Sequence, residues 1–91
     1  MSGESIRDWR IQLLAQLEEM DTQIVGALSF LEGEGGLQER AGEVGVAVLD
    51  TTQDEVRQAA DGLIETAAVA ASAVAALGTF INTFRGYVET L

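Results

Sequence analysis

The chain has 91 residues, which is enough for one small domain and no more. Fifteen acidic side chains against five basic ones give a net charge of −10, which would repel a nucleic acid. Because the sequence has no Cys, His, Lys or Pro, it lacks the usual groups for covalent and acid–base catalysis and for metal binding, so we expect no catalytic residue, cofactor or metal site.

The segment from about residue 5 to residue 32 predicts one amphipathic helix. Ser5 is the expected N-cap, with Asp8 three residues further on. Apolar side chains then recur every three or four residues, which is the period of one helix face. They are Ile6, Trp9, Leu13, Leu17, Met20, Ile24, Ala27 or Leu28, and Leu31. The glycine-rich run 33–36 favours a turn and is expected to end this helix.

Two further helices are expected in the second half of the chain. Residues 37–49 keep helical spacing, although Gly42 and Gly45 weaken it and the valines also alternate as in a strand. Thr52 followed by Glu55 resembles a capping box, and Thr51 followed by Asp54 offers the same bond one residue earlier. Either signal predicts a new helix over about residues 52–90. Its apolar face includes Val56, Ala59, Leu63, Ala67, Ala70, Val74, Leu77, Ile81, Phe84, Val88 and Leu91.

The lengths of these helices limit how they can pack. At 1.5 Å per residue the first would be about 42 Å long and the last about 58 Å, so the first cannot cover the last completely. Either residues 37–49 fold back as the third helix of a small bundle, or another chain covers the remainder. The expected fold is all-α, a helical hairpin or small three-helix bundle with a long C-terminal helix.

An alanine-rich segment within the last helix has two interpretations. Seven alanines between residues 67 and 76 would let another helix approach closely. Residues 66–84 are also uncharged, and this length is close to the roughly 20 residues that cross a bilayer. Polar side chains within the segment, such as Ser72 and Asn82, oppose insertion. Helix pairing is the favoured interpretation, and a single membrane span is the alternative.

The order of helix, glycine turn and longer helix, in an acidic chain of this length without Cys, resembles the small helical-hairpin proteins of type VII secretion. That family carries Trp-x-Gly in the turn, and a Tyr followed four residues later by an acidic residue. Here the turn is Gly-Glu-Gly-Gly over 33–36, and Tyr87 is followed at that distance by Leu91, so no functional residue is carried over. The resemblance implies pairing with itself or a sister hairpin, and export as a folded dimer.

We therefore expect a non-enzymatic protein-protein interaction or assembly protein, either a secreted hairpin of a type VII-like system or a subunit of a larger particle. The alternative is a small single-span membrane protein. The partner would be a second copy or another helical protein, giving a homo-oligomer or a heterodimer, in the cytoplasm or exported without a cleavable signal peptide. The residues expected at the interface are Trp9, Leu13, Leu17, Met20, Ile24, Leu63, Val74, Leu77, Ile81 and Phe84.

Overall fold

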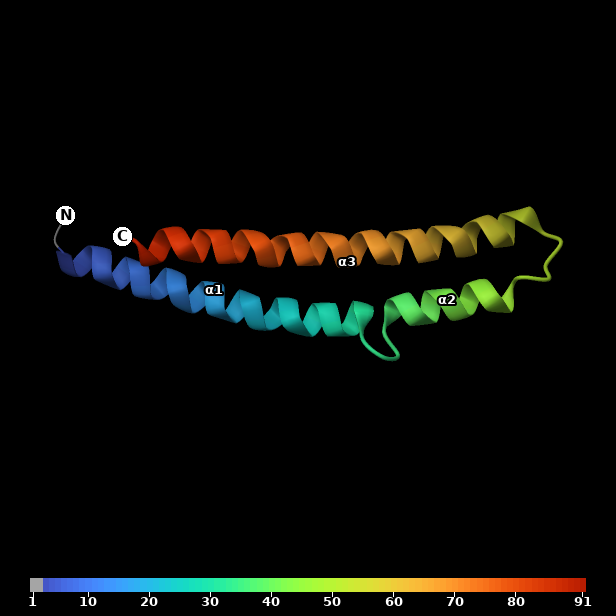
Figure 1. The fold of residues 1–91 in the computed structure, drawn as a ribbon, viewed down its shortest axis with the longest axis horizontal. Helices are drawn as coiled ribbons and strands as arrows, with labels where there is room; N and C mark the ends of the chain where they lie inside the picture. The colour runs from blue at the N-terminus through green and yellow to red at the C-terminus, as the bar shows by residue number, and fades with distance from the viewer. Residues whose placement is uncertain (1–2) are drawn as a thin grey trace.

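A computed structural model describes residues 3–91, with side chains from residue 5 onward. These residues form three α-helices and no strand: α1 (Gly3–Glu32), α2 (Leu37–Ala47) and α3 (Asp54–Glu89). α1 and α2 follow one another nearly in line, and α3 returns antiparallel along both of them (Figure 1). The all-α fold expected from the sequence is confirmed, as a helical hairpin with a long C-terminal helix.

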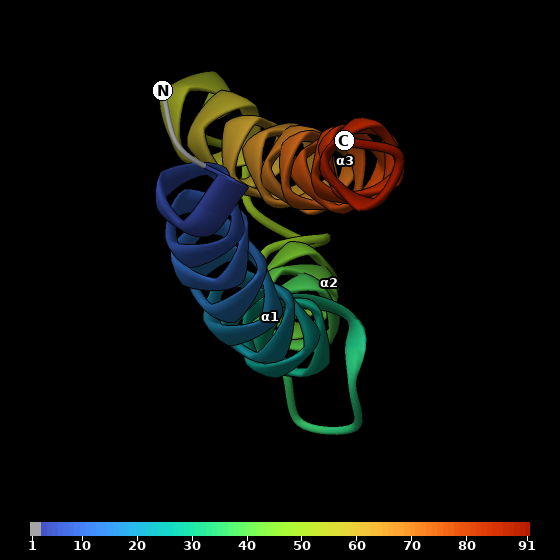
Figure 2. The ribbon, with the colours of Figure 1, turned by 90° about the vertical axis from the view of Figure 1, so that its left-hand side faces the viewer.

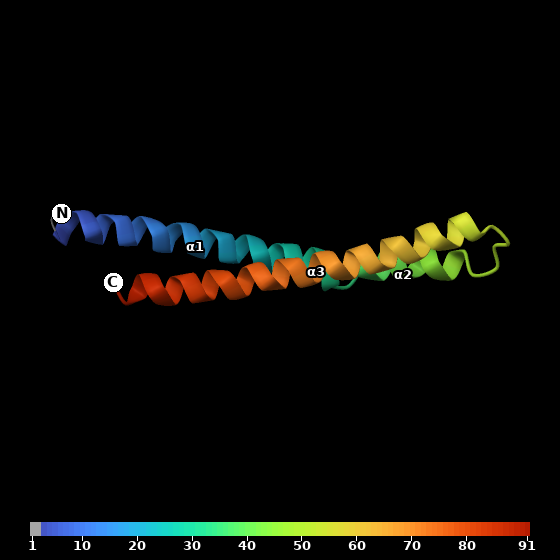
Figure 3. The same cartoon turned by 90° about the horizontal axis from the view of Figure 1, so that it is seen from above.

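The three-helix bundle, which the sequence left open, does not form. Seen from above, α2 continues away from the end of α1 and does not fold back beside it (Figure 3). α3 contacts α1 over its second half and α2 over its first half. α1 is too short to cover all of α3, and α2 covers the part of α3 that α1 does not reach.

The chain passes from α1 to α2 through a tight glycine turn. Gly35 has a φ of +73°, a left-handed backbone conformation that residues other than glycine adopt only at a cost in free energy. The Gly36 N–H donates to the Gly33 carbonyl at 2.9 Å, and the Gly35 N–H donates to the Glu39 carboxylate at 2.7 Å. These bonds close the turn, so that only four residues separate the end of α1 from the start of α2.

Two glycine substitutions should change stability in opposite directions. Gly35→Ala should lower the free energy of unfolding by about 1–2 kcal/mol, because its φ is positive. Gly42→Ala should raise it by about 0.5–1 kcal/mol, because Gly42 is inside α2 and a Cβ there would meet no atom within 4 Å. Urea unfolding followed by circular dichroism measures both. Equal effects at the two positions would contradict this account of the turn.

The expected N-caps are corrected by the structure. α1 begins at Gly3, so Ser5 lies within its first turn and is not the N-cap. α3 begins at Asp54 with Gln53 as its N-cap and without a side-chain capping bond, so the box from Thr52 to Glu55 does not form. Instead, Thr51 Oγ1 accepts a hydrogen bond from the Gln53 N–H at 3.2 Å. The threonine hydroxyl thus stabilises the loop before the helix.

The hairpin is a rod only one layer of helices deep. Its principal dimensions are 70 × 20 × 14 Å, and the view along the rod shows α3 beside the α1–α2 line with a crossing twist (Figure 2). In the part of the chain that the structure describes, no third helix lies over either broad side of this pair. Each helix therefore buries one narrow stripe and leaves the rest of its circumference exposed.

Candidate association surface

The contact between the two arms of the hairpin follows a seven-residue repeat. Most of the buried and half-buried positions on α3 are four and three residues apart in alternation, so they lie along one side of the helix, and Ile64 continues this spacing. We call these positions, with their counterparts on α1 and α2, the seam. On α3 the seam is Ala60, Ile64, Ala67, Ala71, Val74, Gly78, Ile81, Arg85 and Val88. On α1 and α2 it includes Leu14, Leu17, Asp21, Ile24, Leu28, Leu31, Ala41 and Gly45.

The best-buried part of the seam lies between α1 and the C-terminal half of α3. Leu17, Ile81 and Val88 form its buried cluster, and Leu13 and Ile24 pack against it with part of their surface exposed. Towards α2 the seam is built from smaller side chains, and a Cβ on Gly45 would come within 2.9 Å of the Ile64 Cδ1. Small residues therefore allow a close approach there, whereas larger ones fill the other half.

Two polar contacts join α1 to α3 towards the end of the rod where both chain termini lie (Figure 1). Arg85 Nη2 lies 3.5 Å from the Asp21 carboxylate, and Arg10 Nη2 donates to the Glu89 carbonyl at 3.0 Å. Both contacts are solvent-exposed to a degree that limits each to about 1 kcal/mol or less. Their main consequence is geometric, since they join α1 to α3 in one antiparallel register.

The ten residues expected at the interface divide into two groups of five. Five lie on or against the seam, namely Leu13, Leu17, Ile24, Val74 and Ile81. Five others are exposed, namely Trp9, Met20, Leu63, Leu77 and Phe84. The apolar stripe that looks single in the sequence is therefore two adjacent lines, one of which holds the hairpin together while the other is left uncovered.

A shallow apolar groove of about 360 Å³ runs between α1 and the C-terminal half of α3. Residues 13–20 supply its α1 side and residues 77–84 supply its α3 side. On α3 the lining residues are Leu77, Phe80, Ile81 and Phe84, which follow the i, i+3, i+4, i+7 spacing of one helix face. Phe80 is 73% exposed, so its ring stands at the groove's edge in water. We call this the aromatic groove.

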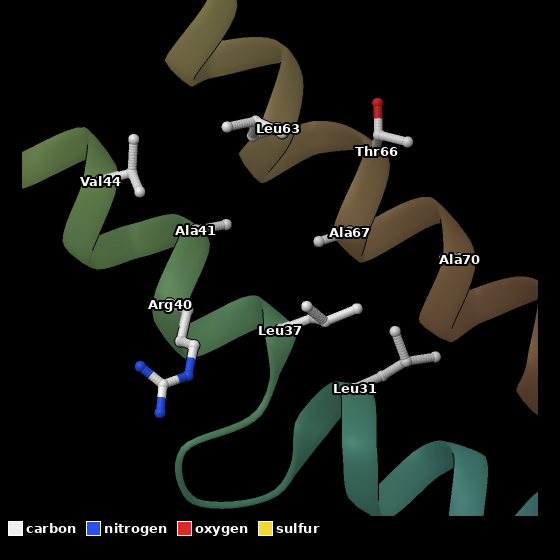
Figure 4. Close-up of a pocket in the computed structure, with 9 residues that line it drawn as sticks. All are labelled: Leu31, Leu37, Arg40, Ala41, Val44, Leu63, Thr66, Ala67 and Ala70. Carbon is white, nitrogen blue, oxygen red and sulfur yellow. The ribbon is translucent and has the colours of Figure 1, made fainter.

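A second groove, of about 380 Å³, lies between α2 and the N-terminal half of α3. Its α3 side has the same spacing and is made by Leu63, Thr66, Ala67 and Ala70. Figure 4 shows the Leu63 and Ala67 side chains pointing across to α2, while the Arg40 guanidinium points away from α3. Alanine and threonine line this groove where phenylalanine lines the other, so we call it the small-residue groove.

Both grooves open on the same side of the hairpin. Each α3 residue of the aromatic groove lies fourteen positions after its counterpart in the small-residue groove, which is two full seven-residue repeats. Positions seven residues apart keep the same place relative to the seam. We call this side the open face. Its line nearer the seam is Val56, Leu63, Ala70, Leu77 and Phe84, and its outer line is Ala59, Thr66, Ala73, Phe80 and Tyr87.

The charge of the chain is kept off the open face. The net charge is −10, yet no acidic residue lines either groove or belongs to the two lines on α3. The one charged side chain in the two linings is Arg40. A random distribution of fifteen acids over so exposed a molecule would place several there. The open face is therefore an apolar surface with an acidic back.

Sequence reasoning missed the outer line of the open face. Phe80 and Tyr87 are 73% and 71% exposed, the two highest values among the large apolar and aromatic side chains. Neither was among the expected interface residues, because both fall one position away from the stripe that helical spacing selects. The signal that could have found them is their separation of seven residues, continued backwards to Ala73 and Thr66.

A metal site and a membrane span are two other features that a helical chain can carry. Among the described residues, no group of three or more His, Cys, Asp or Glu side chains is placed to hold a metal ion. α3 is long and apolar enough to cross a membrane by length and composition, with a mean hydropathy of 1.7 over its most apolar window. Only 11% of that window is buried within the hairpin.

Comparisons of the chain with protein-family models, curated proteins and solved structures find no significant match.

Proposed function

We propose that this chain is a non-enzymatic helical association protein whose open face binds the apolar face of another helical protein chain. Assembly into a larger particle, or export as a hairpin by a type VII-like system, would be the setting in which such a module works. The observation that carries the proposal is the open face itself, with two apolar grooves, exposed aromatic rings and no acidic side chain.

The open face exposes large apolar side chains to water. Soluble monomers rarely leave a continuous apolar patch of several hundred Å² uncovered. Here Leu63, Leu77 and Phe84 are each about half exposed along one line, and Phe80 stands out further beside them. Burial of apolar area is favourable by roughly 25 cal/mol per Å², so a complementary helix face gains free energy by covering them.

The acidic back fits an association protein that stays in water. Glu19, Glu43, Asp61 and Glu65 are all exposed and lie away from the open face. Charged groups distributed in this way keep an assembly soluble after its apolar side has been covered. They also disfavour docking by the back, which restricts association to one side of the rod.

The test is the behaviour of the chain without detergent. We expect it to be recovered from the soluble fraction, to be strongly helical by circular dichroism, and not to float with neutral phosphatidylcholine vesicles in a density gradient. Recovery only from the membrane fraction, with flotation on those vesicles, would contradict the proposal.

That contrary result would support the alternative function, a small single-span membrane protein with residues 66–84 in the bilayer. The hydropathy of α3 is the observation that favours it. In that case α3 would have to separate from α1, because the ion pair between Arg85 of α3 and Asp21 of α1 would not persist once α3 was embedded in lipid.

A further inference from the structure

We propose that the open face is covered by a second copy of this chain, turned end for end so that α3 packs antiparallel on α3 of the second copy. The inference deepens the proposed function and rests on it, because it names the partner and the orientation. In this arrangement the aromatic groove of each copy receives the small-residue half of the other copy, so the same contact is made twice about a two-fold axis.

The outer line of α3 is complementary in size to itself about its middle residue. Ala59 and Thr66 precede Ala73 at intervals of seven, and Phe80 and Tyr87 follow it at the same intervals. A half-turn about Ala73 therefore sets each large ring against a small residue, Phe80 opposite Thr66 and Tyr87 opposite Ala59. Large side chains opposite small ones interdigitate at native packing density, whereas ring against ring would hold the helices apart.

The line nearer the seam follows this rule only in part. The same rotation brings Leu77 within one residue of the position opposite Ala70, a large side chain near a small one, and Phe84 within one residue of the position opposite Leu63, where both side chains are large. The two grooves are lined over 63–70 and 77–84, so they exchange places under the rotation. The aromatic groove thus meets the alanines and the threonine of the small-residue groove, except at Phe84, which meets Leu63.

The axis also falls where it lets the two rods overlap almost fully. Ala73 lies within two residues of the middle of α3, which spans Asp54–Glu89. The offset between the rods is then on the order of 5 Å at 1.5 Å rise per residue, against a rod length of 70 Å. This central position follows from the grooves themselves, because one lies in each half of α3.

The exposed area matches what such a dimer would bury. A compact monomer of this mass exposes about 5,100 Å², whereas the hairpin exposes 6801 Å². The excess is about 1,700 Å² for each copy, and stable homodimers bury about 800 Å² or more for each partner. This excess is spread over the whole rod, and burying about half of it through the open face would be enough to hold two hairpins together as a dimer.

Electrostatics permits a second copy in spite of the net charge of −10 on each chain. The acids lie off the open face, so pairing through that face turns both acidic backs outward. The end-for-end arrangement also places the two Arg40 side chains on opposite sides of the axis, one in each half of the assembly. Pairing by any other side would bring carboxylates of the two copies together and cost free energy.

A single cysteine at the axis tests the proposal directly. The natural chain has no Cys, so Ala73→Cys carries the only thiol in each copy. The axis brings this residue against its own counterpart, at the short separation that a disulfide requires. Under mild oxidation we expect Ala73→Cys to form a covalent dimer on the order of tenfold faster than two control variants.

The controls are chosen on the same helix and with the same substitution. Ala59→Cys lies on the outer line but two repeats from the axis, and Ala75→Cys is exposed on the opposite flank of α3. Equal cross-linking at 59 and 73 would overturn the end-for-end orientation. A non-covalent dimer by light scattering, with no disulfide at 73, would overturn it too.

A chain that is soluble and helical but monomeric at all concentrations would overturn pairing with a second copy, and would leave the proposed function to a different helical partner. A chain found only in membranes would instead overturn the proposed function itself. The helicity of each cysteine variant, measured by circular dichroism, shows that the substitution has left the hairpin intact.

Discussion

Replacing Phe80 with Asp should weaken self-association at least about 100-fold while leaving the hairpin folded. The ring is 73% exposed in the single chain, so its removal costs the isolated hairpin little. In the proposed dimer each ring is buried against the small residues of the other copy, and the substitution occurs twice. Each copy then loses buried apolar area and places a carboxylate in a dry interface, which together account for this size of effect. Sedimentation equilibrium measures the dissociation constant.

The matched control is Val69→Asp. Val69 is also on α3, also large and 60% exposed, but it belongs to neither line of the open face and to neither groove. We expect its dissociation constant to stay within about threefold of the natural chain, since surface substitutions away from an interface cost little. If both variants weakened association equally, net charge and not the open face would be responsible.

Replacing Ile81 with Asp should unfold the hairpin itself. Ile81 is 4% exposed and lies in the buried cluster with Leu17 and Val88. A carboxylate at this position would lose its hydration without gaining a partner, and the apolar contacts of the isoleucine would be lost as well. We therefore expect the free energy of unfolding to fall by about 4 kcal/mol or more. A hairpin with so few buried residues has little stability in reserve. The expected result is loss of most of the helical circular dichroism signal at 25 °C.

A conservative variant keeps this prediction testable. Ile81→Val should cost only about 0.5–1.5 kcal/mol and should retain the native helicity, because it removes one methylene group from the same cluster. The two variants separate the loss of volume from the burial of charge. Retained helicity in Ile81→Asp would mean that α3 is not held by the seam in solution.

The sequence predicts the helical elements well because their signals are local. Helical spacing of apolar residues identifies α1 and α3, and the glycine run identifies the turn where Gly35 needs a positive φ. The capping signals fail at Ser5 and Thr52. Before α3 two threonine hydroxyls, those of Thr51 and Thr52, are adjacent in the sequence. Small differences in loop geometry then decide which of them bonds, as Thr51 does here.

The arrangement of α2 could not be read from spacing. A glycine turn permits either a return or a nearly straight continuation, and the choice depends on where α3 offers a matching surface. Here α3 extends beyond α1 and presents Ala60, Ile64 and Ala67 to the added helix. When α2 continues in line with α1 it covers that surface and stabilises the hairpin. If α2 folded back, half of α3 would have no neighbour.

The open face was predicted only in part for a related reason. Helical spacing of three and four residues does not distinguish a side chain in the seam from one directly beside it. Leu17 and Ile81 therefore entered the same list as Met20 and Leu77, although only the first two are buried. The seven-residue repeat separates them, but its phase becomes visible only when the packing of the two arms is known.

The mass of the natural chain in solution tests the central claim most directly. Light scattering after size exclusion, in detergent-free buffer and over a dilution series, should give about twice the chain mass of 9.6 kDa at the higher concentrations. The mass should fall towards that of one chain only on dilution. A helical, soluble protein of 9.6 kDa at every concentration would contradict the claim that a second copy covers the open face.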